Sequence, residues 1–400
     1  MVSRRDLLKA AGIGAIASGI PGLSLAGTDG EERFVLVILR GAADGLAVAP
    51  PYGDGNYRKV RGELALPAPG DDGGLLKLDG LFGLHPSLEG IHGEYQDQRA
   101  LIVHAVASPY RERSHFDGQD VLENGGAAVG VARDGWLNRS LLPLGSSLGD
   151  EVAIAMAQTT PLVLRGDNSV MSWAPSQMPD ADDSTLRRLQ AMYADDAFFA
   201  TRLTQALEAQ EIAAGESMMS GRQARGNNAQ QTRAMAQATA RFLTADDGPR
   251  IAVIEAGGWD THANQGTTGG ALANRLEALD EGLMALRDGL GDAWSKTVVA
   301  VVTEFGRTVA VNGTRGTDHG TASAAILLGG AVNGGQVVAD WPGLRQSDLH
   351  QGRDLKPTTD MRSLFKGVLS EHLSISANLL NEKVFPDSAV APRLTGLVRA

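Results

Sequence analysis

Four segments of this chain share one design, a run of consecutive apolar residues that ends in a polar loop. The first is "RFVLVILRGAADGL", in which every residue from Phe34 to Leu39 is apolar. The others are "ALIVHAVASPYRERSHF", "RIAVIEAGGWDTH" and "KTVVAVVTEFGRT". Apolar runs without polar alternation are typical of strands that are covered on both faces, as in parallel sheets. The sequence therefore predicts a mostly parallel sheet whose loops gather near one edge.

The segment between the third and fourth runs has the pattern of an amphipathic helix. In "ALANRLEALDEGLMALRDGL" leucines recur at spacings of three and four, at Leu272, Leu276, Leu279, Leu283, Leu286 and Leu290. This spacing places one apolar stripe along a helix. Strand, helix and strand in this order form a crossover unit, which joins parallel neighbours with right-handed connectivity. We therefore expect the α/β class, with a doubly wound, mostly parallel sheet covered by helices on both faces.

The remaining segments fit the same architecture. The stretches "AAILLGG" and "GGQVVADW" read as short strands, the second at an edge. Residues 186–214 and 223–243 read as helices that are separated by a Gly-, Ser- and Asn-rich break at 216–228. These helices form either an inserted cap or layers that cover the sheet, and we favour covering layers. Residues 52–78 are rich in Gly, Pro and Asp and predict a long loop near the mouth of a site.

The N-terminal segment "MVSRRDLLKAAGIGAIASGIPGLSLAG" has the features of an export signal. Its basic start is followed by a run of small apolar residues, which is too Gly-rich, too short and too interrupted by Pro21 to be a stable membrane span. The stretch "SRRDLLK" fits the twin-arginine pattern. We predict a twin-arginine signal peptide at 1–26, recognised by the twin-arginine translocation machinery, and a single periplasmic or secreted domain at 27–400 with a helical segment around 184–243. The alternative is an amphipathic first helix of the fold.

Composition limits the classes of partner and chemistry. The formal charge of -11 argues against a nucleic-acid groove or an anionic membrane surface as the main partner. The chain has no cysteine, which excludes disulfides, thiolate metal ligands and cysteine nucleophiles. Any metal must therefore be bound by carboxylates, imidazoles, amides or water.

Ionisable side chains follow each of the four predicted strands. In an open parallel sheet the ligand crevice lies beyond the carboxyl ends of the strands, where loops and helix N-termini meet. The residues expected there are Asp44 after the first run, Ser114 and His115 after the second, Asp260 and His262 after the third, Glu304 after the fourth, and Asp318 and His319 in the later loop "NGTRGTDHGTAS".

Each of these residues also has a purely structural interpretation. Asp44 fits a turn or a helix cap, and Ser114 fits the N-cap of a following helix. Glu304 can pair with Arg307, and Asp318 can stabilise a glycine turn. The other histidines read as structural or surface residues: His85, His92, His104, His350 and His372.

Taken together, the strand-end residues predict a metal site. Several carboxylates in one crevice would repel and raise each other's pKa values unless cations neutralise them. Imidazole and oxygen ligands without thiolate suit zinc or manganese, with magnesium or calcium at a second, oxygen-rich site.

The motifs "LRGAADGL", "YRERSHFDGQD", "GGWDTHANQ", "TEFGRT" and "GTDHGT" resemble, in order, the bacterial secreted proteins of domain-of-unknown-function family 1501. That family is similar to the alkaline phosphatase and sulfatase superfamily. The resemblance implies an alkaline phosphatase-like fold and a two-metal hydrolase of phosphate or sulfate esters. The implied substrate is a small-molecule or polysaccharide ester.

The resemblance also implies roles for individual residues. Ser114 matches the nucleophile, and Arg111 or Arg113 can hold the substrate oxygens. Asp260, His262 and His319 match the ligands of one metal, with Asp318 beside them as a candidate ligand. Asp44 and Glu304 match ligands of the other metal, together with Ser114. For His115 three roles stay open: metal ligand, acid for the leaving group, or packing beside Phe116.

Two departures from the superfamily pattern bear on function. This chain has Glu304-Phe305 where the superfamily commonly has an Asp-His pair, so the second metal loses an imidazole and its site becomes oxygen-rich, or is absent. One residue separates Asp260 from His262, where the superfamily usually has three. The alternative function is therefore a non-catalytic exported binding or accessory protein that keeps the same scaffold.

Overall fold

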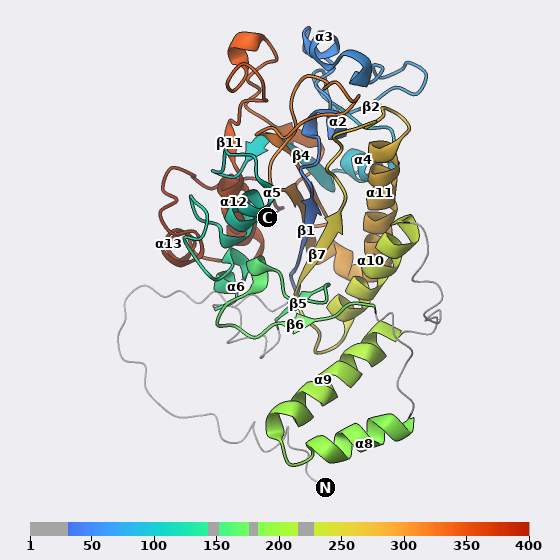
Figure 1. The fold of residues 1–400 in the computed structure, drawn as a ribbon, viewed down its shortest axis with the longest axis vertical. Coiled ribbons are helices and arrows are strands. Elements are labelled where there is room, and N and C mark those ends of the chain that lie inside the picture. Colours follow the sequence, from blue (N-terminus) through green and yellow to red (C-terminus); the bar gives the residue numbers. More distant parts are fainter. Residues whose placement is uncertain (1–30, 143–151, 176–182, 215–227, 400) are drawn as a thin grey trace.

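The computed structural model of this chain describes residues 31–142, 152–175, 183–214 and 228–399. The predicted signal peptide at 1–26 and nearly all of the predicted break at 216–228 lie outside the described residues. Figure 1 shows a central sheet with helices on both sides.

A nine-stranded sheet organises the described part of the chain. Along the sheet the order is β10-β4-β9-β8-β1-β7-β5-β6, and β11 also pairs with β4. The strands are β1 (Arg33–Arg40), β4 (Ala100–Ala107), β5 (Ala153–Ala155), β6 (Met171–Ser172), β7 (Ile251–Gly257), β8 (Thr297–Thr303), β9 (Ser323–Leu328), β10 (Gln336–Val338) and β11 (Thr359–Asp360).

The sheet is parallel except at one strand. β1 is parallel to both β7 and β8, and β10 is parallel to β4. Within this sheet, only the pairings of β9 with β4 and with β8 are antiparallel among the described strands. Because β9 runs against both of its neighbours, β4 points the same way as β8. The four predicted strands therefore end at one edge of the sheet, and the predicted fold class, a mostly parallel sheet with helices around it, is confirmed.

The predicted crossover helix is α11 (Ala271–Leu290), and all six of its spaced leucines are buried. It joins two parallel strands, β7 and β8, as the sequence predicts. These strands are not direct neighbours, however, because β1 lies between them. A crossover pattern fixes strand direction but leaves room for another strand to insert.

Two apolar layers enclose the sheet, and alternate residues of β1 face each of them. Val35, Val37 and Leu39 pack in a core with α4 (Glu89–Gln96), α10 (Asn228–Thr244) and α11. Phe34, Leu36 and Ile38 pack in a second core with α5 (His115–Asn124), α6 (Trp136–Ser140) and α12 (Met361–His372). The two sets of helices lie on opposite sides of β1 in Figure 1. The uninterrupted apolar run of this strand is explained by burial on both faces.

The predicted helix at 186–214 consists of two helices, α8 (Asp183–Tyr193) and α9 (Ala197–Ala214). Only the end of α9 joins the core, through Ala209 and Ala213. Figure 1 shows α8 and α9 beyond the end of the sheet opposite to α2 and α3. The expectation that they cover the sheet therefore holds for α10 and not for α8.

The segment after β1 builds the upper end of the molecule in Figure 1. It contains α2 (Gly45–Val48), α3 (Tyr57–Arg61), a 3-10 turn (Gly62–Leu64) and the two-stranded pair β2 (Leu76–Lys77) and β3 (Gly83–Leu84). Further 3-10 turns lie at Leu162–Leu164, Gly291–Lys296 and Gln346–Asp348. Near the end of the described chain, the short helix α13 (Ala377–Leu379) is followed by a π-helical turn at Leu380–Val384.

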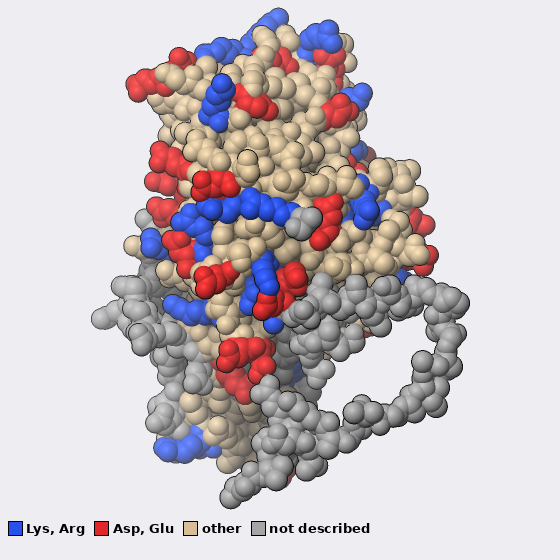
Figure 2. Space-filling view, turned by 180° about the vertical axis from the view of Figure 1, so that it is seen from behind, with Lys and Arg blue, Asp and Glu red and all other residues tan. Residues whose placement is uncertain are grey.

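Charged side chains of both signs are interspersed on the face shown in Figure 2. Small groups of basic residues alternate there with small groups of acidic ones, separated by uncharged surface. None of the described helices combines the length and the apolar composition that a membrane crossing requires.

Candidate functional site

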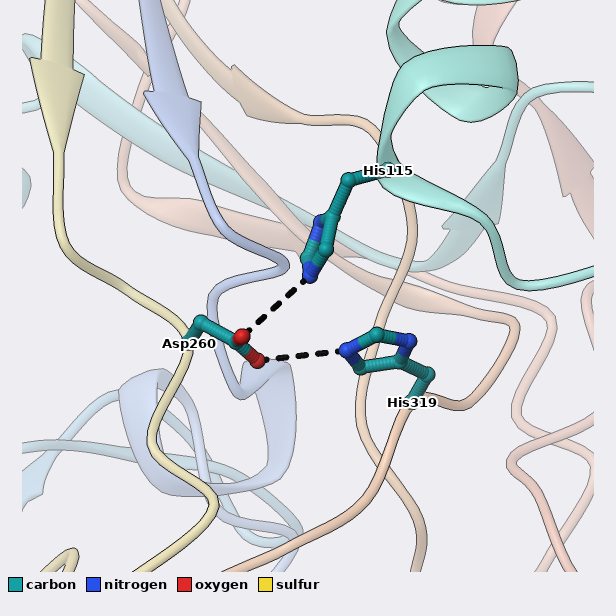
Figure 3. Close-up of side chains that lie close together, drawn as sticks. All are labelled: His115, Asp260 and His319. Carbon is teal, nitrogen blue, oxygen red and sulfur yellow. Dashed lines mark hydrogen bonds and ion pairs between the residues drawn. The ribbon is translucent and has the colours of Figure 1, made fainter.

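Three side chains from separate segments meet beyond the carboxyl ends of the strands. Asp260 follows β7, His115 is the first residue of α5, and His319 lies in the loop between β8 and β9. One ligand atom from each lies within 4.8 Å of the other two, and Figure 3 shows both imidazoles turned toward the carboxylate. Among the described residues this is the group of His, Asp and Glu side chains that could hold a metal ion.

His262 adds a third imidazole beside this group. Its Nε2 lies 3.0 Å from Oδ1 of Asp260 and 2.9 Å from Nε2 of His319. The structure thus brings together Asp260, His262 and His319, which the sequence places in one metal site. The single residue between Asp260 and His262 does not prevent this, because residues i and i+2 of an extended segment point the same way.

Each of the three histidines uses its Nδ1 atom in a hydrogen bond to an outer group. Nδ1 of His115 lies 2.8 Å from Oε1 of Glu304, and Nδ1 of His262 lies 3.2 Å from Oδ1 of Asp318. Nδ1 of His319 lies 2.8 Å from the backbone oxygen of Arg113. Ionised carboxylates and carbonyl oxygens only accept hydrogen bonds, so each Nδ1 carries the proton.

The pKa values of the outer carboxylates agree with this assignment. Burial raises the pKa of Glu304, but hydrogen bonds led by that from His115 outweigh it, so the pKa lies below its ordinary value. The hydrogen bond from Asn312 lowers the pKa of Asp318, and His262 lowers it further. Both carboxylates are therefore ionised near neutral pH and act as acceptors.

The Nε2 atoms of all three imidazoles turn toward the carboxylate of Asp260. Nε2 of His319 lies 3.2 Å from Oδ1 of Asp260, and Nε2 of His115 lies 3.5 Å from its Oδ2. The Nε2 atom of His115 is buried without a hydrogen-bond partner in the described part of the chain. Imidazole nitrogens and a carboxylate that face one another form a donor set that can hold a cation.

The arrangement matches the chemistry of metal-binding histidines. Such histidines donate the second ring N–H to a carboxylate or carbonyl, which fixes the tautomer and the ring orientation. The donors are nitrogen and oxygen atoms without thiolate, a set that suits zinc or manganese. The side chains of His115 and His319 are each 24% exposed and that of Asp260 is 41% exposed, so a ligand can approach from solvent.

Arg307, which the sequence pattern pairs with Glu304, balances the charge of Asp260 instead. Nη1 of Arg307 donates a hydrogen bond of 2.6 Å to Oδ1 of Asp260. Burial raises the pKa of Asp260, but the hydrogen bond and charge of Arg307 outweigh it and lower the pKa below the ordinary value. The sequence pattern suggested Arg307 only as a partner of Glu304, and no local signal points from "TEFGRT" to Asp260.

Two predicted metal ligands are engaged as outer partners of histidines. Glu304 is buried and directs its Oε1 to His115, and Asp318 accepts from His262. Neither belongs to the metal-holding group. Glu304 accepts from His115 at 2.8 Å, and Asp318 accepts from Asn312 at 3.0 Å as well as from His262 at 3.2 Å. Direct ligation of a metal by either carboxylate stays a prediction.

Asp44 is also placed outside the group. Its buried carboxylate forms an ion pair with Arg61 and accepts a hydrogen bond of 2.7 Å from Nε2 of Gln265. It also accepts from the backbone N–H of Leu46, at the N-cap of α2. The helix-cap interpretation of Asp44 thus describes this structure better than metal ligation.

The predicted nucleophile lies next to the group in the chain. Ser114 occupies the N-cap of α5 directly before His115, and its side chain makes no capping hydrogen bond. Its backbone N–H donates to the hydroxyl of Tyr110 at 3.0 Å. The hydroxyl is therefore not committed to holding the helix.

The two predicted anion-binding arginines are committed to other contacts. Arg113 donates from Nε to buried Asp354 at 2.8 Å and from Nη2 to Gln351 at 2.7 Å. Arg111 donates from Nη1 to the backbone oxygens of Ser108 and Tyr110. What Arg113 supplies to the site is its backbone oxygen, which holds His319.

Residues 73–384 match the family described as "Protein of unknown function (DUF1501)". No match is found among curated proteins.

Among solved structures, one similar chain is the phosphonate monoester hydrolase of Agrobacterium radiobacter, at 10% identity and a TM-score of 0.36, over 85% of this chain and 73% of that one. A second is the C-terminal periplasmic domain of EcEptC from Escherichia coli, at 11% identity and a TM-score of 0.37, over 90% of this chain and 87% of that one. A third is Ps i-CgsB in complex with k-i-k-neocarrahexaose, at 12% identity and a TM-score of 0.37, over 76% of this chain and 68% of that one. Similarities this distant do not assign an activity.

Proposed function

The chain belongs to the DUF1501 family of proteins of unknown function, and on the geometry of its site we propose that it is a metal-dependent hydrolase of phosphate or sulfate esters. One observation carries the proposal. Three imidazoles have Nδ1 committed to outer acceptors and turn Nε2 toward one carboxylate, at an edge of the sheet that is open to solvent.

The residues that would hold the metal are His115, Asp260 and His319, with His262 as a further donor. A bound zinc or manganese ion supplies positive charge that polarises an ester oxygen and stabilises the charge developing in the transition state. Arg307 and the outer carboxylates orient the donors before any substrate binds. This preorganisation lowers the cost of reaching the reactive geometry.

Ser114 is the proposed nucleophile. Its hydroxyl is not used as a helix cap, and it lies at the N-terminus of α5, where the partial positive charge of the helix favours an anionic oxygen. In the proposed reaction, the serine oxygen attacks phosphorus or sulfur, the bond to the ester oxygen breaks, and the proton lost by the serine is balanced by the one the ester oxygen gains as it leaves as the alcohol. Water then releases the covalent intermediate and restores the serine.

The proposal includes the location of the protein. Because "SRRDLLK" fits the twin-arginine pattern, we propose that residues 27–400 act as one exported domain in the periplasm or outside the cell. The substrate would be a small-molecule or polysaccharide ester. The long segment 52–78 contacts the strand-end loops through Arg61, which pairs with Asp44, and would form part of the pocket wall.

A second candidate is a non-catalytic metal-binding protein with the same scaffold. It is favoured by the contacts of Arg111 and Arg113, whose guanidinium groups are already used within the chain. Such a protein would bind metal and an anionic ligand without turnover.

The test uses residues 27–400, purified with bound metal, and nitrophenyl phosphate, phosphodiester and sulfate substrates. We expect turnover of at least one substrate, and its loss in Ser114→Ala with metal content and folding unchanged. The matched control is Ser347→Ala, which removes an exposed hydroxyl outside the metal-holding group and should keep full turnover. Turnover that survives in Ser114→Ala would remove the nucleophile role. Bound metal with no turnover on any substrate would favour the second candidate.

A further inference from the structure

Two buried carboxylates lie at the site edge of the sheet in addition to Asp260. Asp44 follows β1 and Glu304 follows β8, and the side chains of both are inaccessible to solvent. A buried carboxylate is costly unless a cation or several hydrogen bonds compensate for its lost hydration. What compensates each of them decides whether this edge can hold a second metal ion.

Asp44 is compensated by the chain itself. Arg61 from α3 forms an ion pair with Oδ2, which also accepts the hydrogen bond from Gln265. The backbone N–H of Leu46 donates to Oδ1. The guanidinium is fully buried and is fixed further by the backbone oxygens of Thr308 and Val309, both 3.3 Å from Nη1. A protein cation therefore occupies the position that a metal would need.

Glu304 is compensated by hydrogen bonds at both oxygens. Oε1 accepts from the backbone N–H of Gly41 at 2.8 Å, from His115 at 2.8 Å and from Gln119 at 3.2 Å. Oε2 accepts from the hydroxyl of Thr303 at 2.8 Å. Four donors leave no oxygen directed at an open position.

An apolar ring lies next to Glu304. Phe305 is buried and stacks on His115, with ring centroids 5.1 Å apart and an interplanar angle of 26°. Its centroid also lies 5.3 Å from that of His319. A phenyl ring offers no ligand atom, so this side of the imidazoles is closed to a second ion.

From these contacts we infer that the site holds one metal ion per chain, because Arg61 pairs with Asp44 and hydrogen bonds satisfy Glu304. The inference rests on the metal site of the proposed function and adds its stoichiometry. His115 then has two roles: its Nε2 faces the metal with Asp260 and His319, while its Nδ1–H donates a hydrogen bond to Glu304.

The test is metal stoichiometry, which does not depend on knowing the substrate. Residues 27–400 are stripped of metal and titrated with Zn²⁺ or Mn²⁺ by calorimetry, and the metal content of the untreated protein is measured by mass spectrometry. One ion per chain is the expected result. Two ions would overturn this inference and leave the proposed metal site standing, whereas no ion in the folded protein would overturn the proposed metal site itself.

A matched pair of substitutions tests whether Asp260 and Asp44 differ in their contribution to metal binding. Asp260→Asn should weaken binding by more than about 100-fold, because it removes a ligand charge, while Asp44→Asn should leave both affinity and stoichiometry unchanged. Loss of metal from a folded Asp44→Asn protein would contradict the inference. Because Asp44→Asn leaves Arg61 without its carboxylate and can impair folding, the double variant Asp44→Leu with Arg61→Met removes both charges. It should still bind one ion.

Discussion

The Nε2 atoms of His262 and His319 lie 2.9 Å apart, within hydrogen-bonding distance of each other. Asp318 holds the proton of His262 on Nδ1, and the backbone oxygen of Arg113 does the same for His319. Burial also lowers the pKa of His319, which keeps that ring neutral. The two Nε2 atoms are therefore adjacent donors that a bound cation could share.

Removing metal should lower the melting temperature of the protein. Only the folded chain brings together donors that are more than 50 residues apart in sequence, such as Asp260 and His319. At a metal concentration about 100 times the dissociation constant, binding adds about 2.7 kcal/mol to the free energy of unfolding. Scanning calorimetry with and without chelator measures the shift. In the His319→Ala variant the chelator should have little effect, and an equal shift there would argue that the metal binds elsewhere.

Glu304 should control metal affinity through His115. Glu304→Gln keeps an oxygen that can accept the Nδ1–H of His115, whereas Glu304→Leu removes it. Loss of the outer acceptor is expected to weaken metal binding by about 10- to 100-fold, and the Gln variant should lose less. Competition with a chelator of known affinity measures both. Equal affinities for the Leu variant and the unchanged protein would show that this contact does not orient the ring.

Two glycines of one loop should respond differently to alanine. A Cβ on Gly316 would lie 2.4 Å from the backbone carbon of His262, whereas a Cβ on Gly313 would meet no atom within 4 Å. Gly316→Ala should therefore displace His262 and reduce metal affinity, and Gly313→Ala should not. The measurement is metal titration of both variants, with circular dichroism to confirm folding. Equal behaviour of the two variants would contradict the placement of this loop against His262.

His104 should make the protein less stable in mild acid. Burial lowers its pKa from 6.5 to about 4. Its Nε2 donates to the backbone oxygen of Ala49 at 2.9 Å, and its Nδ1 accepts from the N–H of Ala105 at 2.8 Å, so the neutral ring is fully satisfied. Between pH 6.5 and 4 the unfolded chain binds more protons at this site than the folded chain. The free energy of unfolding therefore falls as the pH drops through that window, by about 3 kcal/mol in total, and does not change above it.

Denaturant titrations at several pH values test this. His104→Asn cannot titrate, so its stability should be lower at pH 7 but should depend less on pH between 6.5 and 4. Buried His85 and His372 also have lowered pKa values and add to the acid sensitivity of both proteins. The difference between the two curves isolates His104, and parallel curves would show that it does not cause the effect.

The strands and the crossover helix could be predicted because their signals are local. The apolar run of β1 and the leucine spacing of α11 each report burial directly, whatever the rest of the chain does. The rule that parallel strands end at one edge then placed Asp260 and His262 there, and the family resemblance added His319 as a ligand of the same metal. It could not show that β1 inserts between β7 and β8, since strand order depends on which faces pack best.

The role of each carboxylate was decided only by the tertiary structure. Sequence alone gave the same reading to Asp44, Asp260 and Glu304, each an acidic residue after a strand. In the folded chain Asp44 meets Arg61 at the end of α3, Glu304 meets an imidazole N–H, and Asp260 faces the Nε2 atoms of imidazoles. The physical reason is the separation along the sequence over which each signal acts. A hydrophobic pattern adds up over many neighbouring residues, whereas the charge partner of a carboxylate depends on which single donor comes within about 3 Å, and that is set by packing across the whole domain.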